Sequence, residues 1–227
     1  MASLSSLFFP RRCPMCGRYV GEETNSGMLC EECMRTLPRT EQAFVRHNGT
    51  EDALAGVGHL QRAAAYLFFE KQHPIQQVIH QMKYSGQPMI GYQLGRQAAM
   101  EFMCTDFFDG IDVIMPIPLH RKRLRSRGYN QSEYIAMGLS EVTGIPLDTT
   151  HVLRVKDTPQ QALQKGQDRR DNVTDAFEVN HPEQYYRKHI LLVDDLITTG
   201  ETVRACIRSM RPIRGANYSV FALCKAR

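Results

Sequence analysis

The stretch HILLVDDLITTGET, residues 189–202, decides the fold of this chain. Its aliphatic residues come first, then the adjacent carboxylates Asp194 and Asp195, then threonines around Gly200. The aliphatic run predicts a buried strand. The apolar residues that follow recur at helical spacing, which predicts a helix beginning near Glu201 or Thr202. In open α/β sheets ligands bind beyond the carboxyl ends of the strands, so the two acids predict a ligand site there.

The same alternation of strand and helix extends to both sides of this stretch. Strands are expected in AAAYLFF, IDVIMPI, THVLRV, AFEV, HILLV and NYSVFALC, although the alanines of the first would also suit a helix. Helices are expected in PIQQVIHQMKYSG, from Tyr92 to Phe102, in NQSEYIAMGLSEVTG and in ETVRACIRSMR. The strands are nearly continuous in aliphatic residues. This pattern predicts an α/β fold, with a parallel sheet covered by helices on both faces.

Length and composition are those of a globular protein without a membrane span. The chain has 227 residues, of which 42% are hydrophobic and 23% charged, and a net charge of +4. This length allows one full domain and a small appendage. No run approaches the roughly 18 apolar residues of a membrane helix, and the start lacks the basic leader of a signal peptide. The odd count of 7 cysteines fits a reducing compartment, so we expect a cytoplasmic protein.

The acid pair and the threonine turn match two parts of a single ligand. Ionised carboxylates only accept hydrogen bonds, and the 2,3-diol of a ribose offers two donors side by side. The first amides of a helix have no partner within it and suit a phosphate. Negative charge near a sugar also stabilises a transition state that has cationic character. Together these features predict a ribose 5-phosphate site.

The stretch ILLVDDLITTGET resembles the signature of type I phosphoribosyltransferases, which bind phosphoribosyl pyrophosphate (PRPP) with Mg²⁺. The resemblance implies that Asp194 and Asp195 hold the ribose hydroxyls and form the catalytic pair. It implies that the turn after them holds the 5-phosphate, through Thr198, Thr199, Gly200, Glu201 and Thr202.

Three alternatives to a ribose 5-phosphate site are a P-loop ATPase, a dinucleotide-binding fold and a purely structural strand end. LLVDD also resembles the Mg²⁺-binding strand of P-loop ATPases, but no glycine in the chain precedes a lysine, as their phosphate loop requires. The Gly-x-Gly at residues 56–58 lacks the third glycine of a dinucleotide-binding turn. The third alternative is a buried strand that ends in a solvated acidic helix cap.

A basic stretch, PIPLHRKRLRSRGYNQ at residues 116–131, follows another predicted strand and is expected to be a loop. Five of its residues from Arg121 to Arg127 are cationic, and they lie at the same rim as the acids. They could neutralise a pyrophosphate leaving group, because arginine binds phosphate with two hydrogen bonds. Contact with a nucleic-acid backbone and a solvated basic turn are the two alternatives.

Four of the cysteines form two C-x-x-C pairs, Cys13 with Cys16 and Cys30 with Cys33. Two such pairs bring four thiolates into a tetrahedron, which is typical of a structural Zn²⁺ site. A rubredoxin-like iron and disulfides are the alternatives. Cys104, Cys206 and Cys224 lie in apolar patterns and are expected in the core.

The ordered set MKYSG, IPLHRKRLRSRGYNQ, TPQQ, RRDN and LLVDDLITTGET, preceded by four cysteines, resembles the ComF family of competence-associated, phosphoribosyltransferase-like proteins, also called GntX-like. The resemblance covers nearly the whole chain. The stretch from Pro38 to Gly58 is polar and irregular, which predicts a linker or a surface crossing. We therefore expect a zinc-binding, zinc-ribbon-like module at 1–38, a linker at 39–58 and a phosphoribosyltransferase-like domain at 59–227. The resemblance places near the anion site Lys83, Arg127, Asn130 and Gln131, and the basic stretch adds Arg121, Arg123 and Arg125. The same resemblance places in a mobile hood over PRPP the residues Gln161, Arg169 and Asn172.

Two classes of function follow. In the first, the protein binds Mg²⁺–PRPP and transfers or exchanges a phosphoribosyl group on a base or nucleotide. In the second, it is a non-catalytic adaptor in DNA uptake, whose zinc module and basic rim bind single-stranded DNA or a helicase-like partner. The resemblance implies a role in natural transformation or in the use of DNA as a nutrient, and the oligomeric state is open, a homo-oligomer included.

Overall fold

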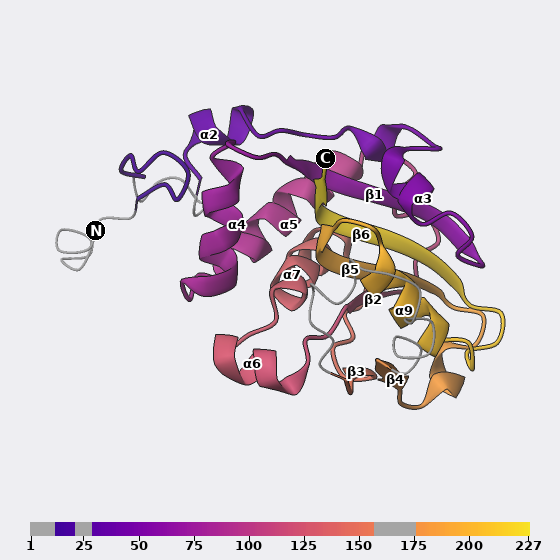
Figure 1. Cartoon of the computed structure of the whole chain (residues 1–227). Helices are drawn as coiled ribbons and strands as arrows, with labels where there is room; N and C mark the ends of the chain where they lie inside the picture. The colour runs from indigo at the N-terminus through magenta and orange to yellow at the C-terminus, as the bar shows by residue number, and fades with distance from the viewer. Residues whose placement is uncertain (1–11, 21–28, 157–175) are drawn as a thin grey trace.

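The computed structural model describes residues 12–20, 29–156 and 176–227, which are coloured in Figure 1. The three positions expected in the hood, Gln161, Arg169 and Asn172, lie outside the described residues. Among the described helices, none combines the length and the apolar character needed to cross a membrane.

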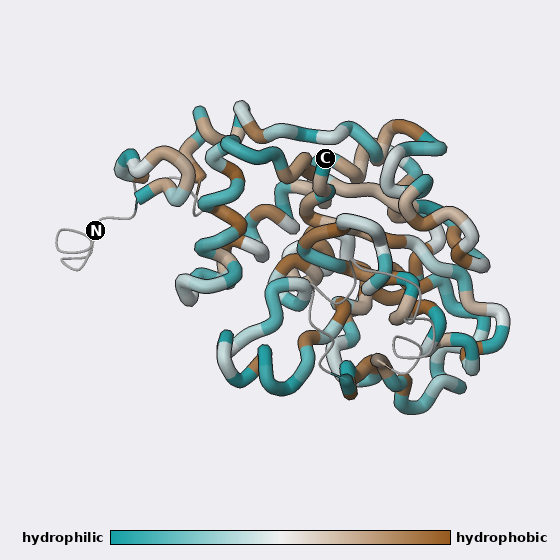
Figure 2. The backbone as a smooth tube through the Cα atoms, in the orientation of Figure 1, coloured by the Kyte–Doolittle hydropathy of each residue, from teal (hydrophilic) through white to brown (hydrophobic). Residues whose placement is uncertain are grey.

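A four-stranded parallel sheet forms the centre of the molecule, in the strand order β1-β6-β5-β2 (Figure 1). Its strands are β1 (Leu60–Phe69), β2 (Val113–Pro116), β5 (His189–Ile197) and β6 (Asn217–Ala226). Apolar residues concentrate along these central strands (Figure 2). The predicted α/β fold with a parallel sheet is confirmed, and AAAYLFF is a strand.

Helices cover both faces of this sheet. They are α4 (Ile75–Tyr84), α5 (Met89–Phe102), α7 (Gln131–Thr143) and α9 (Glu201–Ser209). Successive side chains of a strand point to opposite faces. Accordingly, Leu191 and Val193 of β5 pack in the same cluster as the buried residues of α4, α5 and α7. Ile190 and Leu192 pack on the other side, with the buried residues of α9.

The structure differs from the sequence-based expectation at three elements. The strands β3 (Val152–Arg154) and β4 (Phe177–Val179) pair with each other, antiparallel, in a separate two-stranded sheet. The basic stretch expected as a loop contains a helix, α6 (Arg121–Arg127). The strand β5 does not end before the acids but continues through them to Ile197.

Residues 38–58 pack against β1. Phe68 donates its backbone N–H to the Pro38 carbonyl at 2.8 Å, and Arg39 forms two 2.8 Å hydrogen bonds with the Glu101 carboxylate of α5. A 3-10 helix, η1 (Gln42–Phe44), and a short helix, α3 (Gly49–Ala53), follow. The buried Asn48 caps α3 and donates to the Ala63 carbonyl at 2.8 Å. This stretch is thus structured, while the domain boundaries at 38 and 58 stay a prediction.

The remaining cysteines divide between core and surface. Cys206 and Cys224 are buried, as predicted, but Cys104 is exposed. The expectation for Cys104 was wrong because the chain after α5 turns outward, leaving its neighbour Met103 53% exposed.

Candidate functional site

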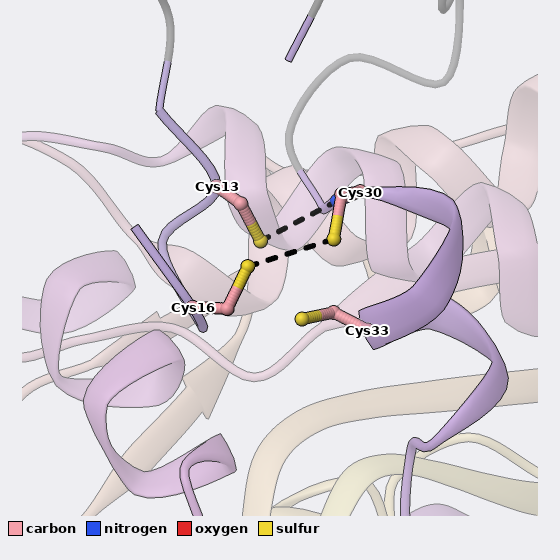
Figure 3. A group of neighbouring side chains, drawn as sticks. All are labelled: Cys13, Cys16, Cys30 and Cys33. Carbon is pink, nitrogen blue, oxygen red and sulfur yellow. Dashed lines mark hydrogen bonds between the residues drawn. The ribbon is translucent and has the colours of Figure 1, made fainter. Parts of the chain in front are cut away.

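The four cysteines converge at one point, as Figure 3 shows. All four sulfur atoms lie within 4.8 Å of one another, and the Sγ atoms of Cys16 and Cys30 are 3.6 Å apart. In a tetrahedral site with Zn–S bonds of about 2.3 Å, sulfur atoms lie about 3.8 Å apart. The four thiols therefore lie close enough together to bind one zinc ion.

Local backbone structure positions these thiols. Cys13 and Cys16 lie in a tight turn in which Gly17 donates to the Cys13 carbonyl at 2.8 Å. Cys30 and Cys33 lie at the start of α2 (Glu31–Arg35). Burial raises the pKa of the Cys13 thiol, but backbone hydrogen bonds, first that of Cys30, outweigh it and bring the pKa to about 7. A thiol with this pKa is readily ionised for metal binding.

The cysteine cluster also belongs to the main hydrophobic core. Cys13 and Cys33 are buried in the same cluster as Ile75, Val78 and Met82 of α4. Gln81 of α4 donates to the Pro14 carbonyl at 3.1 Å. The module is therefore packed against α4, so its folding contributes to the stability of the rest of the molecule.

The acid pair emerges at the carboxyl edge of the parallel sheet. β2 pairs with β5 only as far as Val193, whose carbonyl accepts from the Ile117 amide at 2.8 Å. On the β6 side, pairing continues beyond Asp194 to Ile197. The two acids therefore lose their neighbour on the β2 side while their backbone stays fixed to β6. This places a rigid carboxylate pair where β2 has ended, at the predicted edge of the sheet but within its own strand and not beyond it.

Three side chains from two helices hold these carboxylates. Lys83 of α4 forms a 3.0 Å ion pair with Asp195 Oδ2, to which Gln131 Nε2 of α7 also donates at 3.0 Å. Ser132 Oγ lies 3.5 Å from Asp194 Oδ1. Gln131 Oε1 is buried and accepts no hydrogen bond within the described part of the chain. A buried acceptor without a donor destabilises the folded protein, and a ligand hydroxyl, such as that of a ribose, would supply the donor.

The charges of this cluster depend on one another. Burial, followed by the charge of Asp195, raises the pKa of the Asp194 carboxyl to about 7. Burial lowers the pKa of the Lys83 ammonium, but the Asp195 carboxylate outweighs it, so the pKa of Lys83 is raised overall. Strongly shifted groups of this kind are typical of functional sites. Asp194 thus changes its charge near neutral pH, where a ligand or cation can decide its state.

Asp194→Asn is expected to stabilise the chain increasingly as pH rises. The pKa of Asp194 is raised in the folded protein from 3.8 to about 7, so its stabilising protonation is lost between those pH values. Each unit of pKa difference corresponds to about 1.4 kcal/mol. Urea unfolding of both proteins should show a stability difference that widens from about pH 4 to about pH 7 and is flat above it. A difference independent of pH would contradict the assignment.

A pocket lies in front of the acid pair. Both acids and most of its cationic residues were expected here, but Tyr84, Ser132 and Arg154 were not. It is lined by Lys83, Tyr84, Ile117, Pro118, Leu119, Arg123, Arg127, Gln131, Ser132, Arg154, Asp194, Asp195, Leu196 and Thr202. The charge of Arg154 lowers the pKa of Asp194, opposing burial. Arg154 lies in a short strand with no charge pattern, whereas Tyr84 and Ser132 adjoin the predicted Lys83 and Gln131.

The basic helix α6 divides its arginines between the pocket and the solvent. Arg123 and Arg127, four positions apart, line the pocket, and the Arg127 guanidinium lies over the Tyr84 ring at 4.9 Å. Arg121 and Arg125 are exposed and do not line it. Residues four apart share a helix face, which explains the division. Asn130 uses its side chain locally, accepting from Ser132 N and donating to the Ile117 carbonyl.

The turn after β5 presents backbone donors. Thr198 and Thr199 are exposed, and the amides of residues 198–200 donate to no backbone carbonyl in the described part of the chain. Gly200 has a φ of +78°, and this conformation turns the chain into α9. Thr202 lines the pocket, while Glu201 lies in the first turn of α9, 3.7 Å from Arg204 Nε. Within the described residues, the turn therefore offers backbone amides of the kind that bind a phosphate.

Gly200→Ala is expected to disrupt this turn. A Cβ there would lie 2.7 Å from Leu54 Cδ2 and 3.1 Å from the Ala53 carbonyl oxygen, in a backbone conformation that alanine avoids. Strain and overlap together should lower stability by about 2–4 kcal/mol. Gly144→Ala is the control, because Gly144 has a φ of +72° and open space around its Cα. Thermal unfolding that shows equal losses would mean that the contact with Leu54 is unimportant.

Comparison with known proteins identifies the N-terminal module and relatives that cover most of the chain. Residues 4–52 match the double zinc ribbon domain. The chain is 27% identical over 216 residues to the DNA utilization protein YhgH of Escherichia coli strain K12, covering 94% of this chain and 83% of the relative. It is 28% identical over 218 residues to competence protein F of Haemophilus influenzae, covering 94% and 85%. These relatives confirm the predicted resemblance, and the zinc ribbon match together with the cysteine cluster supports a structural Zn²⁺.

Proposed function

We propose that the chain binds Mg²⁺–PRPP at Asp194 and Asp195 and transfers or exchanges a phosphoribosyl group on a base or nucleotide. The observation that carries this proposal is the acid pair at the carboxyl edge of the sheet, followed by a turn whose amides donate to no backbone carbonyl of the described residues. The names of its relatives refer to DNA utilization and to competence. We accordingly propose that the reaction serves the use or uptake of DNA, in the cytoplasm.

In this proposal the acid pair binds the ribose and stabilises its positive charge. The carboxylates accept from the two ribose hydroxyls, and the amides of residues 198–200 donate to the 5-phosphate. When the anomeric bond breaks, two nearby carboxylates stabilise the cationic sugar. Lys83 and Gln131 act as positioning residues, because they hold Asp195 from the side of α4 and α7. Their contacts fix the carboxylate before the ligand arrives.

The pyrophosphate end would meet the cationic side of the pocket. Arg123 and Arg127 of α6 line the same pocket as the acids, and arginine binds phosphate through two parallel hydrogen bonds. The carboxylate oxygens of the acid pair are ligands of the kind that Mg²⁺ prefers. The ion, bound together with PRPP, would supply neutralising charge there.

A second candidate function is supported by the outward face of α6. Arg121, Lys122 and Arg125 are exposed, and Leu124 between them is 41% exposed. A row of cations beside an apolar side chain suits the backbone of single-stranded DNA. Under this alternative the fold would serve as an adaptor, bound to DNA or to a helicase-like partner, without catalysis.

The two functions are distinguished by their response to ligand and salt. Thermal unfolding should show a rise in melting temperature with Mg²⁺ and PRPP, since a ligand of the folded state stabilises it. Single-stranded DNA is titrated in parallel at two salt concentrations. Affinity for DNA that falls steeply with salt, without any effect of PRPP, would support the adaptor and refute the PRPP site.

A further inference from the structure

A second cavity, of about 500 Å³, lies at the opposite edge of the sheet from the acid pair. The segments that line it lead into the amino ends of β1 and β6, residues 56–59 and 213–216, and the last turns of α9 complete it. The acid pair lies at the carboxyl edge of the same parallel sheet. The two cavities have no lining residue in common, although residues of helix α9 line both.

Four arginines line this cavity, namely Arg204, Arg208, Arg211 and Arg214, and no aspartate or glutamate does within the described part of the chain. Arg204 is held by the Ala53 and Ala55 carbonyls at 2.7 and 2.9 Å, so it forms part of the wall. None of the ion pairs within the described residues involves Arg208, Arg211 or Arg214. Arg208 Nε is buried and has no hydrogen-bond partner among these residues.

This cationic lining favours an anion, and the need is greatest at Arg208, because Arg211 and Arg214 are exposed to solvent, which screens their charge. Like charges in one cavity repel one another, and a buried guanidinium N–H without an acceptor carries a desolvation penalty. Arg208 alone could be explained by its place in the last turn of α9, where a cation stabilises the helix. Arg211 and Arg214 lie beyond the end of that helix, so the helix dipole does not account for them. A ligand with acceptor oxygens would accept from Arg208 Nε, in a cavity that the exposed Arg211 and Arg214 also line.

The other walls indicate what the ligand carries besides its charge. Val57, Ile207 and Ile213 give the cavity apolar surface, and His59 adds an imidazole at its rim. Small-molecule pockets are typically about 300–1,000 Å³, so this one is larger than a single inorganic phosphate requires. Arginine forks recognise phosphate, and apolar and imidazole groups suit a planar ring.

We propose that this cavity binds a nucleoside 5′-phosphate, with the phosphate on Arg208 and Arg211 and the base against Val57 and Ile213. The site is separate from the acid pair and does not depend on PRPP binding. The same chemical group occurs in a free mononucleotide and at the phosphorylated end of a DNA strand, and both sources present it to the cavity in the same way.

Calorimetric titration of the full chain with 2′-deoxyadenosine 5′-monophosphate, without Mg²⁺, tests this site. We expect one site that remains in Asp194→Asn with Asp195→Asn, where the acid pair no longer contributes, and that binds at least tenfold more weakly in Arg208→Ala with Arg211→Ala. Deoxyadenosine, which lacks the phosphate, should bind at least tenfold more weakly than the monophosphate. A 5′-phosphorylated oligothymidylate that competes, when its unphosphorylated form does not, identifies a DNA end as a source. Competition by neither oligonucleotide identifies the free mononucleotide.

Two controls keep the outcome decisive. Arg35→Ala removes an exposed arginine of α2, far along the chain from this cavity, and should leave binding unchanged. Arg211→Gln alone changes an exposed residue and should weaken binding without lowering the melting temperature, even if the double variant folds poorly. The proposal is overturned if the monophosphate does not bind the intact chain, if the arginine variants bind it normally, or if the aspartate variants lose it.

Discussion

Replacing Cys33 with serine is expected to release the metal and to destabilise the protein by several kcal/mol. The thiolates of a zinc module supply much of its folding free energy, about 10–16 kcal/mol in isolated zinc fingers. Here the loss extends further, because Cys33 and Cys13 are buried in the same cluster as α4. Elemental analysis should give about one zinc per intact chain and far less in the variant, and thermal unfolding should begin at a lower temperature.

Cys104→Ser is the matched control for this experiment. Cys104 is a free, exposed cysteine outside the four-cysteine group, so its replacement should change neither zinc content nor stability. Chelation of the intact protein should reproduce the effect of Cys33→Ser. A protein that stays equally stable and folded after complete removal of zinc would show that the cysteines do not support the fold.

Asp195→Asn is expected to weaken PRPP binding by about 100-fold. The carboxylate accepts from Lys83 and Gln131, and in our proposal also from a ribose hydroxyl. Hydrogen bonds to a charged group contribute about 1.5–3 kcal/mol each, and 1.4 kcal/mol is tenfold in affinity. The substitution also leaves the ammonium of Lys83 in the pocket without its partner. Isothermal titration with Mg²⁺ and PRPP measures the change.

Two further variants separate a direct role from a structural one. Asp195→Asn alone should also lower stability, because it leaves the Lys83 ammonium unpaired. Lys83→Met with Asp195→Asn removes both partners of the ion pair and should restore much of that stability. It should not restore PRPP binding. Asp109→Asn changes an exposed carboxylate elsewhere and should have no effect. If the double variant bound PRPP as well as the intact chain, the carboxylate of Asp195 would have no part in the ligand site.

The sequence predicted the parallel sheet and the position of the acids because both depend on local patterns. Buried parallel strands are continuous in aliphatic residues, and Asn130 and Gly144 mark the ends of α7 as a helix cap and a left-handed stop. The cysteine spacing predicted the four-cysteine cluster for the same reason. Two C-x-x-C pairs that bind one ion need no information about the rest of the fold.

Features that depend on long-range packing could not be predicted in this way. A basic helix without apolar spacing looks like a loop, so α6 was missed although its Arg123 and Arg127 share a face. The strands β3 and β4 have the composition of sheet strands, but only their partners reveal that they pair with each other. Arg154 reaches the acid pair from β3, which nothing in its neighbouring sequence indicates.

The most direct test of the central claim is calorimetric titration of the intact chain with PRPP in the presence of Mg²⁺, repeated on Asp194→Asn with Asp195→Asn. The same titration in Arg208→Ala with Arg211→Ala accounts for any PRPP that enters the arginine-lined cavity. We predict a saturable site that is lost with the aspartates and retained with the arginine variants. Binding that is absent from the intact chain, or that survives the loss of both aspartates in the arginine variants, would contradict a sugar-phosphate site at the acid pair.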